Sequence, residues 1–479
     1  MRKPHTANIG SILRNLPSID EILAAESIND LRSDIGPKRL AELARTAVES
    51  LRAEIQAASV SDDNSNDAFS RPRLTEAAVD RLKSLLSEAD GKRLKRVINA
   101  TGVIIHTNLG RAPLSDAAKN ALLSEASGYC NLEYDLATGK RGKRGAHAER
   151  ILAEITGAES SVIVNNCAAA AFLILTVFAS GREVIVSRGE LVEIGGDFRV
   201  PDVLIQSGAI LKEVGTTNRT KIRDYESAIG ERTAMILRVH PSNYKIVGFT
   251  EKPDLSEMAD LAHQNGIVVY EDAGSGAIFD LSEYGLADEP QISRSIAAGV
   301  DIVSFSGDKL LGGPQSGLIV GRADLIEQIR AHPLYRALRV DKLTLSVLES
   351  TLNSFRRGTA FCDIPVLKML STNSDELSDR ANSLVRQARK MLNYDSELQI
   401  DVFPGNSVVG GGAAPSVTQV TTLIALSHTT LSAGELEYRL RLAEPPVIIR
   451  IVDEKVLIDL RTVLEYEEPE LLEALVKLA

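Results

Sequence analysis

The chain is poor in residues that cross-link a protein or bind metals in clusters. Its 479 residues include three cysteines and no tryptophan. The cysteines, Cys130, Cys167 and Cys362, are odd in number and far apart, which argues against a disulfide framework and against a paired-cysteine metal cluster. We therefore expect reduced thiols and no metal site.

Long apolar runs are also missing. A stretch such as Ala168 to Ala179 falls short of the roughly 20 apolar residues that a membrane-spanning helix needs. The start of the chain, Met1 to Asn15, mixes cationic and polar residues and lacks the apolar centre of a secretory signal. Both observations predict a cytoplasmic protein that does not associate with membranes.

Positive charge is in deficit, because the formal net charge is -11. Non-specific attraction to nucleic acid depends on Lys and Arg, so this balance predicts no DNA partner and allows only a local contact with RNA. The remaining composition, 44% hydrophobic and 25% charged, is typical of globular domains. A chain of this length needs more than one hydrophobic core, and we expect two or three domains.

The first part of the chain has helical patterns. Ser18 to Glu21 fits a capping box, and Pro37 fits the first turn of an amphipathic helix. The polar stretch Ser59 to Arg73 is too poor in apolar residues to pack and predicts a linker or mobile loop. We predict a small helical domain over residues 1–70, followed by a linker helix over 71–96.

From Val97 onward, short runs rich in Val and Ile alternate with helical patterns. This alternation predicts an α/β domain over 97–340 with a mostly parallel sheet covered on both faces. The predicted strands are Ser161 to Val164, Glu183 to Val186, Ala234 to Val239, Ile267 to Tyr270, and Asp301 to Phe305. Ligands of such sheets bind beyond the carboxyl ends of the strands, so the residues that follow each strand are the candidates for function.

Residues 341–479 are predicted to form a linking helix and an α+β domain. The helical patterns run from Lys342 to Arg356, from Glu376 to Leu392 and from Glu435 to Arg441, and strand patterns lie at Val417 to Ala425 and Val456 to Leu460. Between them, Gly405 to Pro415 contains three consecutive glycines. No strand-to-helix transition frames this segment, so we predict a flexible loop without a phosphate-binding role.

The strongest chemical pattern is the segment Ser304 to Gly317, which continues a buried strand and contains Lys309. A lysine in this position is suited to form a Schiff base with pyridoxal phosphate. That cofactor also needs a carboxylate that keeps its ring nitrogen protonated. Asp272 follows another buried strand and is the candidate for that role.

A phosphate group needs backbone donors at the start of a helix. Asn165, Asn166, Cys167 and Ala168 lie where a strand gives way to an alanine-rich helix, and Ser306 adds a hydroxyl near the lysine. The order of phosphate turn, aspartate and lysine is that of the aspartate-aminotransferase-like cofactor enzymes.

Other interpretations of these residues remain open at this point. A lysine in a glycine-rich turn is more often a solvated surface residue, and an aspartate after a strand is more often a helix cap. A nucleotide-binding P-loop does not fit, because Asp308 precedes Lys309 and Leu310 follows it. The combination of lysine, carboxylate and phosphate turn in one domain favours the cofactor site.

Several long segments make the chain resemble the bacterial L-seryl-tRNA(Sec) selenium transferases from end to end. They are Leu16 to Asp20, Val97 to Leu114, Ser187 to Gly196, Val214 to Arg219, the lysine segment, Leu338 to Thr344 and Pro445 to Arg450. The resemblance implies the α/β fold of pyridoxal-phosphate-dependent transferases of fold type I. That fold has a mostly parallel seven-stranded sheet flanked by helices, here with a small helical N-terminal domain and an α+β C-terminal domain.

The resemblance also implies a reaction. Pyridoxal phosphate on Lys309 would convert seryl-tRNA(Sec) to selenocysteinyl-tRNA(Sec) through an aldimine, beta-elimination to dehydroalanyl-tRNA, and addition of selenium from selenophosphate. Lys309 would move protons, with Asp308 as an additional acid. The helical N-terminal domain would read the shape of the tRNA. A homodecamer, built as a pentamer of dimers, is implied as well.

Further site residues follow from matching positions of the family. Thr216, Thr217 and Asn243 match positions near the cofactor. Four arginines match positions that bind the selenium donor, namely Arg111, Arg144, Arg336 and Arg339. Arginine presents a planar fork of donors suited to a tetrahedral oxyanion. The last two are three residues apart on a predicted helix, Leu334 to Arg339, and would face one ligand together.

Two alternative functions remain. One is a related lyase or desulfurase that acts on a free amino acid with the same Lys309 and Asp272, which the N-terminal domain argues against. The other is a non-catalytic tRNA-binding or scaffold protein. The intact set of lysine, aspartate and arginines argues against that second alternative.

Overall fold

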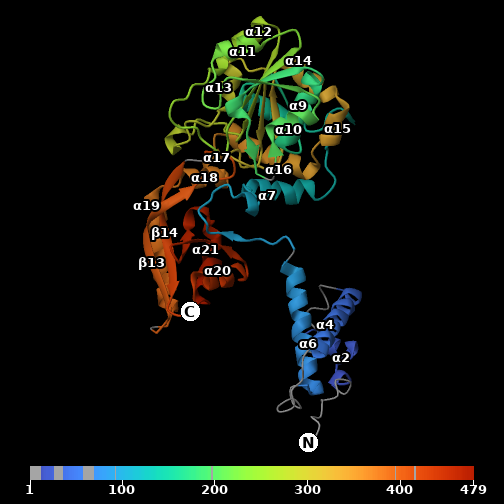
Figure 1. Cartoon of the computed structure of the whole chain (residues 1–479), viewed down its shortest axis with the longest axis vertical. Helices are drawn as coiled ribbons and strands as arrows, with labels where there is room; N and C mark the ends of the chain where they lie inside the picture. The colour runs from blue at the N-terminus through green and yellow to red at the C-terminus, as the bar shows by residue number, and fades with distance from the viewer. Residues whose placement is uncertain are drawn as a thin grey trace, which may run out of the picture. The chain divides into compact units, whose positions relative to one another are not determined.

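The computed structural model describes residues 12–25, 28, 36–57, 69–91, 93–195, 198–393, 395–414 and 417–479. The chain forms two compact units, Met1–Arg96 and Val97–Ala479. Figure 1 shows the helices of the first unit in blue, and the second unit in colours that run from light blue and teal at its start through green to red at its end. No helix of the described ranges is both long enough and apolar enough to cross a membrane.

The first unit is helical, with helices α2 (Ile19–Leu23), α4 (Pro37–Ala57) and α6 (Arg71–Gly91). The capping box predicted at Ser18 is confirmed, because its hydroxyl accepts from Glu21 N and its N–H donates to the Glu21 carboxylate at 2.7 Å. Helix α6 shares one apolar core with the other two. It already begins at Arg71, so the predicted linker is wrong for its last three residues. Residues 59–68 of that linker lie outside the described residues.

The second unit contains the predicted seven-stranded sheet. Its strands are β4 (Ser160–Val164), β5 (Glu183–Ser187), β8 (Ile210–Val214), β9 (Thr233–Val239), β10 (Val268–Gly274), β11 (Ile302–Ser306) and β12 (Gly317–Gly321). Their spatial order is β4-β12-β11-β10-β9-β5-β8. Only β12 runs antiparallel to its neighbours. The mostly parallel sheet that the sequence predicts is therefore confirmed.

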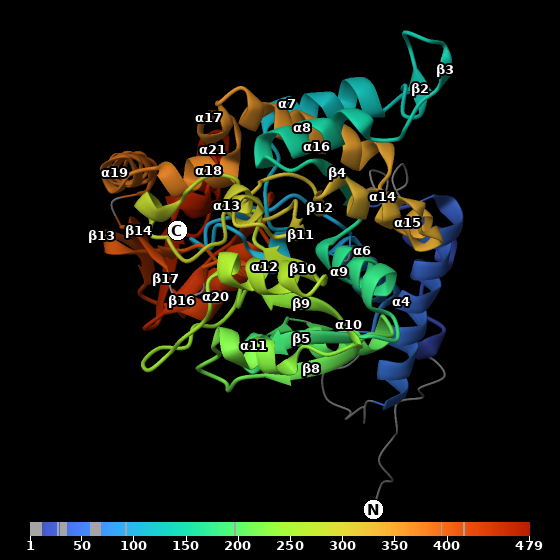
Figure 2. The same ribbon diagram turned by 90° about the horizontal axis from the view of Figure 1, so that it is seen from above.

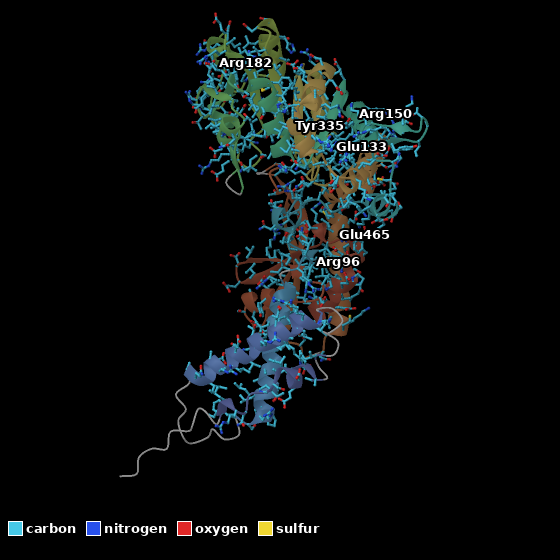
Figure 3. The ribbon with its side chains drawn as sticks, turned by 90° about the vertical axis from the view of Figure 1, so that its right-hand side faces the viewer. Arg96, Glu133, Arg150, Arg182, Tyr335 and Glu465 are labelled. Atoms are coloured by element: carbon cyan, nitrogen blue, oxygen red, sulfur yellow. The ribbon has the colours of Figure 1, made fainter. Side chains whose placement is uncertain are left out.

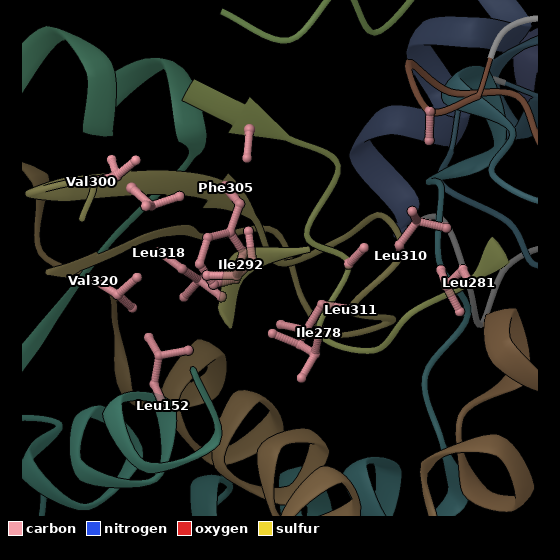
Figure 4. Close-up of a cluster of buried hydrophobic side chains, with 14 of the residues drawn as sticks. Leu152, Ile278, Leu281, Ile292, Val300, Phe305, Leu310, Leu311, Leu318 and Val320 are labelled. Carbon is pink, nitrogen blue, oxygen red and sulfur yellow. The ribbon is translucent and has the colours of Figure 1, made fainter. Parts of the chain in front are cut away.

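Helices cover both faces of this sheet because successive strand residues point to opposite sides. Ile236 and Val303 belong to one core, whereas Leu237 and Ile302 belong to the other. Figure 2 shows α12 and α13 on one side of the strands and α9 and α10 on the other. Figure 4 shows part of the first core. The helices of this part are α7 (Asp116–Ala121), α8 (Ala146–Thr156), α9 (Cys167–Ala179), α10 (Val200–Gln206), α11 (Ile222–Ala228), α12 (Leu255–Gln264), α13 (Ile292–Ala297), α14 (Ala323–Ala331), α15 (Pro333–Leu338) and α16 (Lys342–Arg356).

The C-terminal part is an antiparallel sheet with helices. Its strands are β13 (Leu398–Val408), β14 (Thr418–His428), β17 (Lys455–Asp459) and β16 (Arg450–Val452), in that spatial order. The helices are α17 (Ala360–Asp363), α18 (Pro365–Ser371), α19 (Ser374–Met391), α20 (Ala433–Arg441) and α21 (Glu468–Val476). Two short strands, β1 (Ile98–Asn99) and β15 (Val447–Ile448), pair in parallel and bring the start of the unit to this part.

The predicted loop from Gly405 to Pro415 is wrong for its first residues, because β13 continues to Val408. Gly405 faces Leu423 on the neighbouring strand, and a Cβ atom there would lie 2.3 Å from the Leu423 side chain. Close packing against the Leu423 side chain therefore favours a glycine at this position of the strand. The loop begins after Val408.

Candidate active site

The carboxyl ends of the central strands bring the predicted lysine and carboxylate together. Asp272 in β10 is paired with Ser304 in β11, and Lys309 follows β11 in a tight turn. Gly307 starts that turn, and a Cβ atom there would lie 2.1 Å from Ser316 Oγ. The turn therefore requires a glycine, and it holds Lys309 with only 6% of its surface exposed.

The Lys309 amine lies under the glycine-rich loop. Its Nζ donates to the carbonyl oxygen of Gly412 at 3.4 Å. Gly412 has a φ of 75°, and a Cβ atom there would lie 3.1 Å from the amine. Burial lowers the pKa of Lys309, and the positive charge of Arg111 acts in the same direction. A lowered pKa increases the neutral, nucleophilic fraction of the amine.

Asp308 and Arg111 form an ion pair beside the lysine. Arg111 Nη1 lies 2.7 Å from Asp308 Oδ2, and the Asp308 side chain is 9% exposed. Arg111 has a φ of 64°, a left-handed conformation that is uncommon for a residue with a side chain. Two predicted site residues from distant parts of the chain therefore meet at Lys309.

The predicted phosphate turn lies between β4 and α9. Asn166 caps the helix, because its Oδ1 accepts from Ala169 N at 2.8 Å. The Asn165 N–H is also used, since it donates to Leu338 O. Within the described residues, the N–H groups of Cys167 and Ala168 make no hydrogen bond at this helix start. These two N–H groups are thus the backbone donors available to a phosphate.

Ser306, at the end of β11, lies level across the sheet with the end of β4, where the phosphate turn begins. It pairs with Gly317, which in turn pairs with Val164 at the end of β4. A Cβ atom on Gly317 would lie 2.1 Å from Asn166 O, so β12 supports the turn from directly beside it.

Arg144 and Arg339 meet on one carboxylate. Arg144 Nε donates to Glu133 Oε1 at 2.8 Å, and Arg339 Nη1 lies 3.5 Å from the same oxygen. Figure 3 marks Glu133. The hydrogen bonds from Arg144 and Arg141 hold the pKa of Glu133 below its ordinary value. The carboxylate therefore stays ionised at the point where two of the predicted donor-binding arginines converge.

The predicted helix containing both Arg336 and Arg339 is wrong at its end. Helix α15 stops at Leu338, and Arg339 has an extended conformation that forms a bridge with Val164. Arg336 is exposed in the last turn of the helix. The backbone leaves the helix because Arg339 joins the edge of the sheet beside β4. The two side chains therefore do not share a helix face.

Three further predicted residues lie near the next strands of the sheet. Thr216 and Thr217 follow the edge strand β8, and Thr216 Oγ1 donates to Arg219 O at 3.0 Å. Thr217 and His240 line a cavity of about 820 Å³. Asn243 donates to Glu193 O at 2.7 Å. Contacts of these three side chains with Lys309 are not found among the described residues, and their cofactor roles stay predictions.

Ser242 is a site residue that the sequence did not single out. It is 2% exposed, and its hydroxyl has no hydrogen-bond partner within the described part of the chain. Its Oγ lies 3.5 Å from the position that a Gly412 Cβ would occupy, next to the Lys309 amine. Ser242 follows the end of strand β9, so the rule that ligands bind beyond the carboxyl ends of the strands could have indicated it.

These residues fit pyridoxal phosphate. A buried amine, a half-buried carboxylate, open N–H groups at a helix start and the unpartnered Ser242 hydroxyl all lie at the carboxyl ends of strands β4, β9, β10 and β11. Together with the seven-stranded sheet they define a protein with the fold type I of pyridoxal-phosphate-dependent transferases. A solved structure entitled "Structure of D-Glucosaminate-6-phosphate Ammonia-lyase" has a similar fold, with a TM-score of 0.54 and 22% identity over 82% of this chain and 97% of that one.

The chain belongs to the L-seryl-tRNA selenium transferase family. The family model of that description matches residues 97–464, and the model "Selenocysteine synthase N terminal" matches residues 13–52. L-seryl-tRNA(Sec) selenium transferase of Geobacter sulfurreducens is 44% identical, over 98% of this chain and 100% of the relative. The protein of the same name from Alkaliphilus metalliredigens is 47% identical, over 98% and 99%.

Proposed function

We propose that the protein converts the serine of seryl-tRNA(Sec) to selenocysteine, with selenophosphate as the selenium donor and pyridoxal phosphate held by Lys309. The observation that carries this proposal is the meeting of Lys309, Asp272 and the start of α9 in a member of this family. The cofactor, when bound, supplies an electron sink that weakens the bonds at Cα and Cβ of the serine. We expect the enzyme to act in the cytoplasm.

Lys309 acts as the base at the serine Cα. Its lowered pKa favours the neutral amine that can accept a proton, and the Gly412 carbonyl gives the protonated amine a nearby acceptor. Asp308, fixed by Arg111, supplies negative charge that stabilises the protonated form. Lys309 would therefore take the proton from Cα and give it to the oxygen of the departing β-hydroxyl, which leaves Cβ as water.

Asp272 holds the cofactor's ring nitrogen, and the N–H groups of Cys167 and Ala168 hold its phosphate. A helix start favours an anion through its open donors and its dipole. Thr216, Thr217, Asn243 and Ser306 complete the cofactor site in this proposal. The cofactor ring would thus be held at its nitrogen by Asp272 and at its phosphate by the start of α9.

Arg144 and Arg339 bind the tetrahedral selenium donor, with Arg111 and Arg336 as further contacts. Glu133 supports this assignment, because an anionic group already lies between two of these guanidinium groups. The donor would take the place of that carboxylate. Arg forks pair with oxyanions through two parallel hydrogen bonds.

The helical unit recognises the tRNA in this proposal, and the active molecule is a homo-oligomer, a decamer of five dimers. The match of residues 13–52 to the family's N-terminal model supports a specialised role for this unit.

The test is selenium transfer from selenophosphate with purified protein and three acceptors: seryl-tRNA(Sec), seryl-tRNA(Ser) and free serine. We expect product on seryl-tRNA(Sec) alone. Lys309→Ala should abolish both the product and the visible absorbance of the bound cofactor, whereas Lys368→Ala should leave both unchanged because Lys368 is a surface partner of Glu465. Turnover of free serine alone would instead assign the protein to the lyases of small amino acids.

A further inference from the structure

One oxygen of the Asp272 carboxylate is occupied by the protein. Asp272 Oδ1 accepts two hydrogen bonds, one from Ser304 Oγ at 3.3 Å and one from Cys167 Sγ at 3.5 Å. The other oxygen, Oδ2, receives no hydrogen bond from the residues that the structure describes. The carboxylate therefore has a side fixed by the protein and a side left for a ligand.

The hydrogen bond from Ser304 to Asp272 is part of a chain that leads to the buried residue Tyr270. The Tyr270 hydroxyl lies 2.7 Å from Ser304 Oγ, and both residues are fully buried. Burial raises the pKa of Tyr270 well above its ordinary value, so the phenol keeps its proton. A protonated phenol can donate to Ser304, which leaves the serine hydroxyl hydrogen for Asp272. In this chain Tyr270 donates to Ser304, and Ser304 donates to Asp272.

Cys167 adds a second donor from the phosphate turn. Burial, together with the negative charge of Asp272, raises the pKa of Cys167 well above its ordinary value. The thiol therefore stays protonated at neutral pH and can donate to Oδ1. The backbone N–H of the same residue is one of the open donors at the start of α9. One residue thus touches the carboxylate and contributes to the phosphate turn.

The donors counteract the cost of burying Asp272. Burial raises the pKa of this carboxyl, whereas Cys167, the positive charge of Lys309 and Ser304 all act to lower it. Ionised Asp272 keeps a ring nitrogen protonated only if the proton does not move onto the carboxylate. Removing donors to Oδ1 makes the carboxylate more basic and draws that proton away from the ring.

We infer that Cys167, Ser304 and Tyr270 are positioning residues that fix Asp272 through Oδ1 and direct Oδ2 towards the ring nitrogen of pyridoxal phosphate. This inference rests on the proposed cofactor role of Asp272. It assigns a role to a thiol that forms no disulfide. It also makes the phosphate turn and the carboxylate parts of one hydrogen-bonded unit.

The test uses the full-length holoenzyme and three variants, Cys167→Ala, Ser304→Ala and Tyr270→Phe. Tyr270→Phe keeps the ring and removes only the hydroxyl. The measurement is the absorbance of the bound cofactor as a function of pH, together with the dissociation constant of pyridoxal phosphate. We expect the pH midpoint of the absorbance change to rise in all three variants, and cofactor affinity to fall several-fold in Cys167→Ala and Ser304→Ala.

Two controls separate this role from a general loss of structure. Cys167→Ser keeps a donor at the same place and should restore a midpoint close to that of the wild type. Cys130→Ala removes an exposed thiol and should change nothing. Unchanged midpoints in Tyr270→Phe and Cys167→Ala, with cofactor bound, would overturn the inference. A wild-type protein without any cofactor absorbance would instead overturn the proposed function itself.

Discussion

At the residue scale, the Lys309 amine owes its properties to side chains far away in sequence. Arg111 pairs with Asp308 across a separation of 197 residues. Because a pattern of residue types along the chain does not show such a pairing, the sequence predicted each residue separately and missed their contact. The same holds for Glu133, which no motif marked and which joins Arg144 to Arg339.

We predict that Arg111→Gln moves the pH dependence of cofactor binding upward. The positive charge of Arg111 helps to lower the pKa of Lys309, and without it the protonated amine persists to higher pH. The unpaired Asp308 acts in the same direction. The rate at which pyridoxal phosphate combines with cofactor-free protein should therefore reach its plateau about one pH unit higher. A midpoint that stays in place or falls would contradict this account.

We also predict that Arg144→Lys and Arg339→Lys each raise the KM for selenophosphate by about tenfold and change cofactor absorbance little. Lysine keeps the charge and loses the planar fork, at a cost of roughly 1 to 2 kcal/mol per lost charge-assisted bond. The matched control is Arg150→Lys, since Arg150 is an exposed partner of Glu154 on α8. Equal KM values in all four proteins would remove these arginines from the donor site.

At the scale of elements, the close contact between β12 and the phosphate turn gives a prediction for one glycine. Gly317→Ala places a Cβ atom against Asn166 O and must displace the turn. Overpacking of this kind costs about 1 to 3 kcal/mol, so cofactor affinity should fall roughly tenfold. Gly230→Ala is the control, because its Cβ would meet no atom within 4 Å. Identical dissociation constants for both variants would show that the turn does not depend on β12.

The elements that the sequence predicted well are the buried ones. Strand β5 was predicted as Glu183 to Val186 and spans Glu183–Ser187, because a fully buried strand is a continuous apolar run. Strand β8, at the edge of the sheet, was not among the predicted strands. Its residues Lys212 and Glu213 are partly or fully exposed and break that run. Strand β13 was not predicted, and its last residues, Gly405 to Val408, were assigned to a loop because of the glycines in that segment.

At the scale of the whole molecule, the two compact units have separate cores. We predict that a protein consisting of Val97–Ala479 folds and binds pyridoxal phosphate with the absorbance of the full chain. Selenium transfer to seryl-tRNA(Sec) should fall by at least tenfold, because the proposed tRNA contacts of residues 13–52 are lost. Full activity of the shortened protein would refute a tRNA-binding role for the helical unit. Loss of the absorbance would show that the unit is needed for the cofactor site.

The glycine-rich loop has a consequence for the order in which the site is made during synthesis. Lys309 precedes Gly412, the residue whose carbonyl meets its amine, by 103 positions. The segment that packs under the loop, Ile104 and Ile105, is bonded to Val408 and Val409 from the same late part of the chain. A ribosome therefore releases the lysine, its carboxylate and the phosphate turn well before the cover that buries them. A nascent chain presents an open, hydrated lysine, and only the finished molecule encloses it.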